Sequence, residues 1–424
     1  MNTFGTEFIL MFIGIGSEEP APPELIFTTL HSSDVDVTVE VPSLSYKRSL
    51  TVSPSHSAFD SLSRDVRMSG SGKSNKGVLV TASAEVSVYG INKGLYSTDG
   101  FLALPMDTLG KEYYAISSAV NGKYCELGIV ATKDNTMVHL VLPAHGNVRI
   151  EYKGKTYQQG ESIAVALDRL ETFQLQTTSD LTGLHIVSNE LIAAYSGHRA
   201  MNVGSQPDHS VVQLVPVSRW GKKFAVTSFP RRSNGDIIRL VTSVDDTTLT
   251  IDGSETALKY TGSHHDINLP SDSSIFFSTD KPIFVVQFEN ATKPGDIAIA
   301  LVPSVEQYQP KCMFASPDAF EGIFINMGLI TVLATEKDKV YIDSDSVSSI
   351  GEAWQTVLGS SPVMVAKRIG VSAEQQHHMY MKNSTEKFGV ILFGYTNKET
   401  YSFPVALGLE VLNSAVCVLQ HSVY

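Results

Sequence analysis

A four-residue signature occurs three times in this chain, as Gly5-Thr6-Glu7-Phe8, Gly110-Lys111-Glu112-Tyr113 and Gly221-Lys222-Lys223-Phe224. The copies start 105 and 111 residues apart. Self-similarity at a nearly constant period indicates a fold built from repeated units. Because a repeated array offers extended surfaces, the pattern favours a binding or structural protein over an enzyme with one cleft.

A second recurring segment follows the signature and predicts two strands joined by a tight turn. It occupies residues 129–140 after the second copy and 240–251 after the third. The turns are Asp134-Asn135 and Asp245-Asp246. Asp and Asn tolerate the left-handed backbone that tight turns need, so we expect a hairpin at each place.

Two further phrases mark the ends of the repeats. The first contains a proline, as Leu104-Pro105, Leu214-Val215-Pro216-Val217 and Leu301-Val302-Pro303-Ser304-Val305. Proline cannot donate to a strand ladder, so it suits a crossing point at a sheet edge. The second phrase, residues 186–195 and 276–286, predicts two strands joined by a short polar turn.

These signals predict an all-β protein made of tandem, β-sandwich-like units of about 105 residues. The expected boundaries are 1–105, 106–216 and 217–303 for three repeats, 304–410 for a degenerate fourth, and 411–424 for a C-terminal tail. The alternative is a β-propeller with two blades per repeat, because hairpin signals recur about every 50 residues.

Composition narrows the class of protein. The 424 residues are 42% hydrophobic and 18% charged, which argues for a folded chain. The formal charge of −12 disfavours a nucleic-acid partner, and no apolar stretch is long enough for a membrane span. The short apolar run Phe8–Ile15 is expected to be a first strand. No basic residue precedes it, so we expect that a signal peptide is missing from this chain.

The cysteines and the glycosylation sequons help to predict whether the protein is secreted or stays inside the cell. Cys125, Cys312 and Cys417 lie far apart without a Cys-x-x-Cys pair, which leaves room for one disulfide and an odd thiol. The sequons beginning at Asn290 and Asn383 are candidate glycosylation sites and fit a secreted protein.

Several ordered phrases give the chain, over roughly residues 5–410, a family resemblance. It resembles the N-terminal domain of the IgG-Fc-binding protein family. The phrases are Val80-Thr81-Ala82-Ser83, Val88-Tyr89-Gly90, residues 97–105, Asp180-Leu181-Thr182-Gly183, Tyr195-Ser196-Gly197, residues 217–222, Asp280-Lys281-Pro282-Ile283, residues 302–308 and Phe393-Gly394-Tyr395. The resemblance implies a secreted, non-enzymatic module associated with Fc or mucin interaction, adhesion and mucosal innate defence. Relatives often carry cysteines after the Ser-Gly phrase, whereas this chain has His198 and no cysteine there.

Several clusters of polar residues are candidate metal-binding sites. His198, Asp208 and His209 have zinc-ligand chemistry but irregular spacing, so an ordinary polar loop is favoured. The pairs His264-His265 and His377-His378 point to opposite faces of a strand. Residues 343–346 suggest an acidic turn in preference to a calcium loop.

Nucleotide and hydrolase motifs are incomplete. Residues 69–75 lack the first glycine of a phosphate-binding loop and predict a flexible loop. No Gly-x-Ser-x-Gly elbow stands on a strand-to-helix turn. Trp220 is expected to serve packing. We therefore expect no catalytic residue, no cofactor and no metal.

The functional prediction is an extracellular adhesion or recognition module that is not an enzyme. Its partner is expected to be a protein or glycoprotein, mucin-like or immunoglobulin-like. The alternative is a structural spacer of a larger secreted assembly, and a weaker one is a carbohydrate-active enzyme.

Overall fold

A computed structural model describes residues 3–16, 20–95, 97–118, 124–145, 148–202, 207–230, 234–289, 298–320, 322–373 and 375–413. The side chains of residues 201, 202, 207 and 208 are outside this description. The described ranges consist of β-strands, short 3-10 helices, turns and loops, with no α-helix. The expected all-β class is confirmed.

The strands fall into four groups along the chain, which we call units 1 to 4. Unit 1 contains β1 (Gly5–Leu10), β2 (Glu24–Thr28), β3 (Val35–Val41), β4 (Tyr46–Val52), β5 (Ala58–Ser61), β6 (Gly72–Ser74), β7 (Val78–Gly94) and β8 (Ser97–Leu102). Unit 2 contains β9 (Gly110–Tyr114), β10 (Cys125–Ala131), β11 (Thr136–Val141), β12 (Ile150–Tyr152), β13 (Lys155–Tyr157), β14 (Ser162–Leu167), β15 (Thr172–Thr177), β16 (His185–Asn202) and β17 (Pro207–Gln213).

Units 3 and 4 complete the set. Unit 3 contains β18 (Gly221–Thr227), β19 (Asp236–Thr242), β20 (Thr247–Ile251), β21 (Ser254–Leu258), β22 (His264–Leu269), β23 (Ser274–Glu289) and β24 (Ile299–Leu301). Unit 4 contains β25 (Lys311–Ala315), β26 (Ile325–Leu333), β27 (Val340–Ile342), β28 (Asp345–Ser346), β29 (Gln355–Thr356), β30 (Met364–Val371), β31 (Gln376–Met381), β32 (Phe388–Tyr395) and β33 (Thr400–Pro404).

The same pairing order recurs in every unit. In units 1 to 3 one long strand, β7, β16 or β23, crosses the whole sheet. Its first half pairs with the first and third strands of the unit, and its second half pairs with the second and last strands. In unit 4 the long strand is divided into β31 and β32. The domain boundaries drawn from the sequence stay a prediction.

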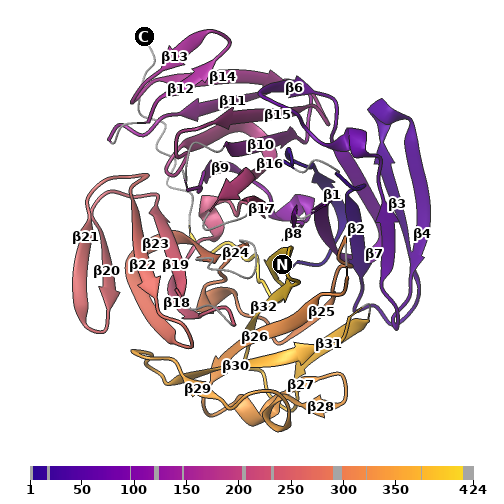
Figure 1. Ribbon diagram of the computed structural model, residues 1–424, viewed down its shortest axis with the longest axis vertical. Coiled ribbons are helices and arrows are strands. Elements are labelled where there is room, and N and C mark those ends of the chain that lie inside the picture. The colour runs from indigo at the N-terminus through magenta and orange to yellow at the C-terminus, as the bar shows by residue number, and fades with distance from the viewer. Residues whose placement is uncertain are drawn as a thin grey trace.

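The four units follow one another around a common centre (Figure 1). The last strands of the units, β8, β17, β24 and β33, pack against one another there. Unit 4 returns to unit 1, because Thr28 Oγ1 and Tyr89 Oη donate to the carbonyl oxygen of Met313 over 3.0 and 3.2 Å. The chain is a closed ring in which units 1 to 3 each supply one large curled sheet and unit 4 supplies two smaller ones, whereas the propeller alternative assigned two blades to each repeat.

Strand pairing differs from the sequence prediction in two ways. The expected hairpins are wrong, because β10 and β11 both pair with β16, which lies between them, and β19 and β20 likewise flank β23. The phrase expected to form two strands is one bent strand, β16 or β23.

A polar side chain at the bend explains why the long strand continues. The backbone ladder shifts register there, and a side-chain oxygen replaces the missing carbonyl partner. The bonds are Asp36 N to Ser83 Oγ at 2.9 Å, Met137 N to Asn189 Oδ1 at 2.7 Å, and Thr248 N to Asp280 Oδ1 at 2.6 Å. The polar residues that predicted a turn therefore keep the strand hydrogen-bonded through its bend.

The segment predicted to be a flexible loop, residues 69–75, is also different. Its residues Gly72–Ser74 form β6, which pairs with β15 of unit 2. Lys73 Nζ lies 2.8 Å from Glu171 Oε2. The segment is fixed in place because β6 of unit 1 pairs as an edge strand with the sheet of unit 2.

The signature begins β1, β9 and β18, and its glycine has a steric role. A Cβ added at Gly5 or Gly110 would overlap the ring of Pro105 or Pro216 from the proline phrase that ends the same unit. The aromatic residue of the signature is buried in each copy. Signature and proline phrase recur together because they pack on each other.

This contact predicts a position-specific cost. Gly110→Ala is expected to lower the free energy of unfolding by about 1–3 kcal/mol, because the proline ring and its backbone cannot move aside. Gly370→Ala is the matched control, since nothing lies within 4 Å of a Cβ added there. Urea titration measures both, and equal costs would contradict the packing argument.

Candidate functional site

A buried carboxylate lies at the centre of the ring. Asp99 lies on β8 and is 0% exposed. Its Oδ1 accepts from the amides of Gly100 (2.8 Å) and Ser402 (3.2 Å), and its Oδ2 accepts from the amide of Val211 (3.0 Å). The amide of Ile299 also donates to it. Asp99 therefore collects backbone N–H groups from all four central strands.

The environment of Asp99 acts on its pKa in two directions. Burial raises the pKa well above its usual range, and the four backbone amides oppose this shift by stabilising the carboxylate. A small cavity beside the strands is lined by Phe101, Gln213 and Phe403, among others, and its volume of about 10 Å³ has room for no more than one water molecule. The described residues at the centre therefore form a packed, hydrogen-bonded junction of strands and not a ligand-binding cleft.

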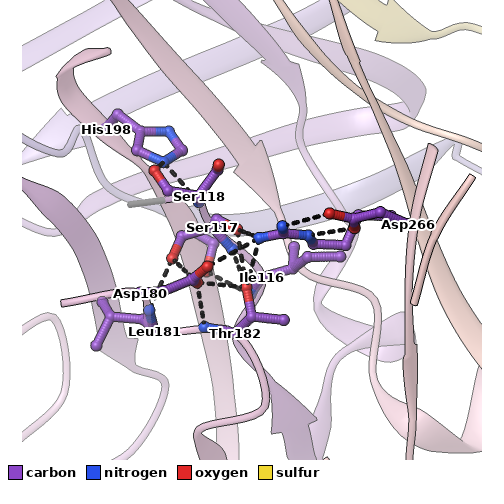
Figure 2. Close-up of polar contacts among 10 residues, drawn as sticks. Ile116, Ser117, Ser118, Asp180, Leu181, Thr182, His198 and Asp266 are labelled. Carbon is purple, nitrogen blue, oxygen red and sulfur yellow. Dashed lines mark hydrogen bonds and ion pairs between the residues drawn. The ribbon is translucent and has the colours of Figure 1, made fainter. Parts of the chain in front are cut away.

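A second polar cluster lies where unit 2 meets unit 3. Figure 2 shows Asp180, which precedes β16, facing Ser117 and Thr182. Asp180 Oδ1 accepts from Ser117 Oγ (3.0 Å) and from Thr182 N (2.9 Å). Ser117 Oγ in turn accepts from Leu181 N at 2.8 Å. These bonds fix the Asp180-Leu181-Thr182-Gly183 phrase against the end of β9.

Arg239 of β19 joins this cluster to unit 3. Its Nη1 lies 2.9 Å from Asp180 Oδ2, and its Nε and Nη2 each donate to an oxygen of Asp266 over 2.7 Å. Nη1 also donates to the carbonyl oxygen of Ser117. Burial alone would raise the pKa of Asp180, but Arg239 and the bonds from Thr182 outweigh it and hold that pKa below its usual range. The arginine is an electrostatic bridge between two units.

Removing the bridge is expected to weaken the junction. Arg239→Met keeps the apolar stem but leaves two carboxylates without their cation, at a cost of about 2–3 kcal/mol in the free energy of unfolding. The control is Arg149→Met, because Arg149 and its partner Glu151 are exposed and their pair contributes at most about 0.5 kcal/mol. Indistinguishable urea midpoints for the two variants would refute this role.

His198 and His209 are buried within the protein and use both ring nitrogens there. His198 Nε2 lies 2.9 Å from both the amide nitrogen and the carbonyl oxygen of Ser118, and its Nδ1 lies 2.7 Å from Ser210 Oγ. His209 bonds the carbonyl oxygen of His198 and the amide of Asn92. Burial lowers the pKa of His198 to about 4 and that of His209 to about 3. The neutral rings serve packing and hydrogen bonding.

This geometry does not activate a serine. A nucleophilic serine needs a base that accepts its proton and an open path for the substrate. His198 and Ser210 are both buried. The side chain of Asp208, the third residue of the zinc hypothesis, lies outside the described residues. Within those residues, no group of three or more His, Cys, Asp or Glu side chains is placed to hold a metal.

The other histidine pairs follow the sequence prediction. His377 faces inward and bonds Asp343 Oδ2 over 2.9 Å, while His378 faces outward and stacks on Tyr380. His264 and His265 occupy successive positions of β22. Asp343 has a left-handed backbone, with φ at 53°, and its Oδ1 accepts from the His378 amide. It belongs to a hydrogen-bonded turn.

Tryptophan and cysteine placements are internal. Trp220 is 2% exposed, stacks on Phe284 and donates from Nε1 to the carbonyl oxygen of Val215 over 2.8 Å, as expected for a packing role. Cys125 and Cys312 are buried free thiols in different units, so they do not form a disulfide with each other. Burial raises the pKa of Cys125 to about 11.

Of the two sequons, one can be placed. Asn383 is exposed in the turn that divides β31 from β32, with φ at 54°. Asn290 and Cys417 lie outside the described residues.

Two functional positions escaped the sequence reasoning. Asp99 was part of a recognised phrase, but nothing local indicates that three other strands converge on it. Arg239 had one usable signal, since it is a cation with two apolar residues on each side in the strand Asp236–Thr242. A charge in such a strand predicts a buried partner, though not which unit supplies it.

Comparison with known proteins decides the family. The model of the family described as IgGFc binding protein matches residues 99–394, which is more than half of the chain. The chain belongs to the IgGFc-binding protein family. A human relative, IgGFc-binding protein, is 24% identical over 425 residues and aligns with 97% of this chain. The chain spans 8% of that relative's length.

Solved structures add no argument about this IgGFc-binding domain. Two structures of Escherichia coli alpha-2-macroglobulin, one activated by porcine elastase and one by trypsin, both match at a TM-score of 0.14. Their sequence identities are 10% and 7%, each match covers 95% of this chain, and they cover 44% and 41% of the matched chains.

The family membership indicates a binding module and confirms the resemblance seen in the sequence. The family is named for binding and is not an enzyme family. Among the described residues, the structure has no helix long and apolar enough to cross a bilayer.

Proposed function

We propose that this chain is a non-catalytic, extracellular recognition module that binds a glycoprotein. The observation that carries the proposal is membership in a family described by what it binds, together with a ring whose centre is closed by Asp99. The name of the human relative points to an immunoglobulin Fc partner, and the mucin-like alternative remains part of the proposal.

The ring supports this proposal through what it buries. The histidines His198 and His209, the central carboxylate and the Arg239 bridge are all engaged within the protein, so they serve the scaffold. The exposed sheet faces and loops are then the surfaces that bind the partner, as in other rigid β scaffolds. Such surfaces bind through a few aromatic and charged anchors.

Biolayer interferometry against purified probes tests the function. The probes are IgG Fc, a native secreted mucin and the same mucin after removal of its O-glycans. We expect saturable binding to at least one native glycoprotein with a Kd of about 1 μM or tighter. Binding to none of the three would overturn the proposal in favour of a spacer, and release of sugars from the mucin would show an enzyme.

Glycosylation at Asn383 tests the extracellular part of the proposal. Because Asn383 is exposed in a turn, the chain made through a secretory pathway is expected to carry an N-glycan there. Mass spectrometry should find one glycan fewer in Asn383→Gln, whereas Asn413→Gln, which alters no sequon, should leave the mass unchanged apart from the substitution. A bare Asn383 in the secreted protein would count against the prediction.

A further inference from the structure

Unit 4 presents an unusual polar and aromatic face. Its sheet β25-β31-β27-β28 reaches the outer rim of the ring at β27 and β28 (Figure 1). Along β31 the side chains alternate, so that His377, Met379 and Met381 are buried while His378 and Tyr380 are partly exposed. The outward face of this sheet therefore collects residues from neighbouring strands.

Three rings on this face form two stacked pairs that share Tyr380. Tyr380 is opposite Tyr341 of β27, and their ring centroids are 5.8 Å apart with an interplanar angle of 23°. His378, two residues before Tyr380 on β31, stacks on the Tyr380 ring, and their centroids are 4.9 Å apart. Because the rings brace one another, a ligand would find them preorganised.

Two lysines lie beside these rings. Lys311 of β25 is directly opposite Tyr380 and is exposed. Lys382 Nζ lies 4.7 Å from the centroid of the Tyr341 ring. None of the ion pairs among the described residues involves either lysine. The nearby carboxylate of Asp343 is already bonded to His377 and to the His378 amide. Asp343 and the exposed Asp345 keep their negative charges, so this face offers an anion the two exposed ammonium groups and not an excess of positive charge.

We propose that this face, defined by Lys311, Tyr341, His378, Tyr380 and Lys382, binds an acidic glycan. The apolar faces of sugar rings pack on aromatic rings, and a cluster of such rings without a deep pocket suits an oligosaccharide. The two free ammonium groups complement sulfate or carboxylate groups along it. The inference rests on the proposed function, and names the chemistry that the module recognises on its glycoprotein partner.

Titration calorimetry with defined oligosaccharides tests the site. The probes are a chondroitin sulfate hexasaccharide and the unsulfated hexasaccharide of the same backbone. The unglycosylated chain is expected to bind the sulfated probe at least about tenfold more tightly, with an affinity that falls as salt rises. Equal binding of the two probes, or no heat of binding at 1 mM probe, would overturn the proposal.

Substitutions locate the binding on this face. Tyr380→Ala, and separately the exposed pair Lys311→Gln with Lys382→Gln, are each expected to weaken binding about tenfold. The control pair is Lys155→Gln with Tyr157→Ala, because Lys155 also lies over a tyrosine ring, at 4.3 Å, but is paired with Glu161. The control is expected to change the affinity less than about twofold. The lysine variants keep the test decisive if Tyr380→Ala does not fold.

Two further results separate this proposal from its rivals. If the parent and the lysine variant bind native mucin equally well, the proposed function stands and this site fails. If the parent binds neither mucin, nor Fc, nor the hexasaccharide, both fail. Because Asn383 follows Lys382 directly, the chain's own glycan is a competing occupant. Binding that disappears when Asn383 is glycosylated and returns in Asn383→Gln would overturn the external-ligand proposal.

Discussion

Asp99→Ala is expected to lower the free energy of unfolding by more than about 4 kcal/mol, the largest effect of any single substitution here. The substitution leaves four buried backbone amides without their acceptor at the point where four strands meet. Asp99→Asn is expected to cost less, because its remaining oxygen still accepts from two of these amides. Urea unfolding measures both, with refolding from denaturant as a check on reversibility.

The control for this prediction is Asp34→Ala. Asp34 is exposed, so its removal is expected to change the free energy of unfolding by less than about 0.5 kcal/mol. A cost for Asp99→Ala near that of the control would mean that the four central strands hold together without the carboxylate.

Glu126→Gln is expected to stabilise the protein strongly at alkaline pH. Glu126 lies on β10 and is 0% exposed, Gln176 donates to its Oε1, and its Oε2 has no hydrogen-bond partner within the described residues. Burial raises the pKa of Glu126 from 4.5 to about 8, more than Gln176 and Arg199 lower it. The neutral amide of glutamine resembles the protonated acid that the folded state prefers.

The pH dependence of this gain follows from linkage. Between pH 4.5 and 8 the folded parent holds a proton that the unfolded chain has lost, so the stability of the parent falls as pH rises through this window. The advantage of Glu126→Gln should therefore grow from near zero at pH 4.5 to the order of 4–5 kcal/mol at pH 8. Urea titrations at several pH values measure it.

The matched control for this pH dependence is Glu151→Gln. Its carboxylate is exposed, so the same titrations should show no pH-dependent gain. A difference between Glu126→Gln and the parent that stays constant from pH 4.5 to 8 would show that Glu126 titrates normally.

Local chemistry allowed the strands to be predicted but not their partners. The signature, the proline phrase and the apolar run from Phe8 all fall in strands or at junctions, because strand alternation and proline geometry act within a few residues. The expected hairpins failed for the opposite reason. A tight turn at Asn135 is compatible both with pairing across it and with a third strand inserted between its arms, and only the rest of the sheet decides.

The polar sites were harder to predict because their partners come from distant units. Asp99 is bonded by Val211 and Ser402, which lie 112 and 303 residues away. Arg239 lies 59 residues from Asp180. His198 and His209 suggested a metal by composition, whereas their nitrogens are used by Ser118 and Asn92. No local periodicity carries such information.

Hydrogen exchange at the four central strands tests the closed ring most directly. The account predicts that peptides covering β8, β17, β24 and β33 exchange among the slowest in the chain and with the same protection, because their amides meet on Asp99 and open only when the ring unfolds. Asp99→Ala should then lower the protection of all four together. Four different levels of protection, with one central strand exchanging freely while the others stay protected, would contradict a ring closed at its centre.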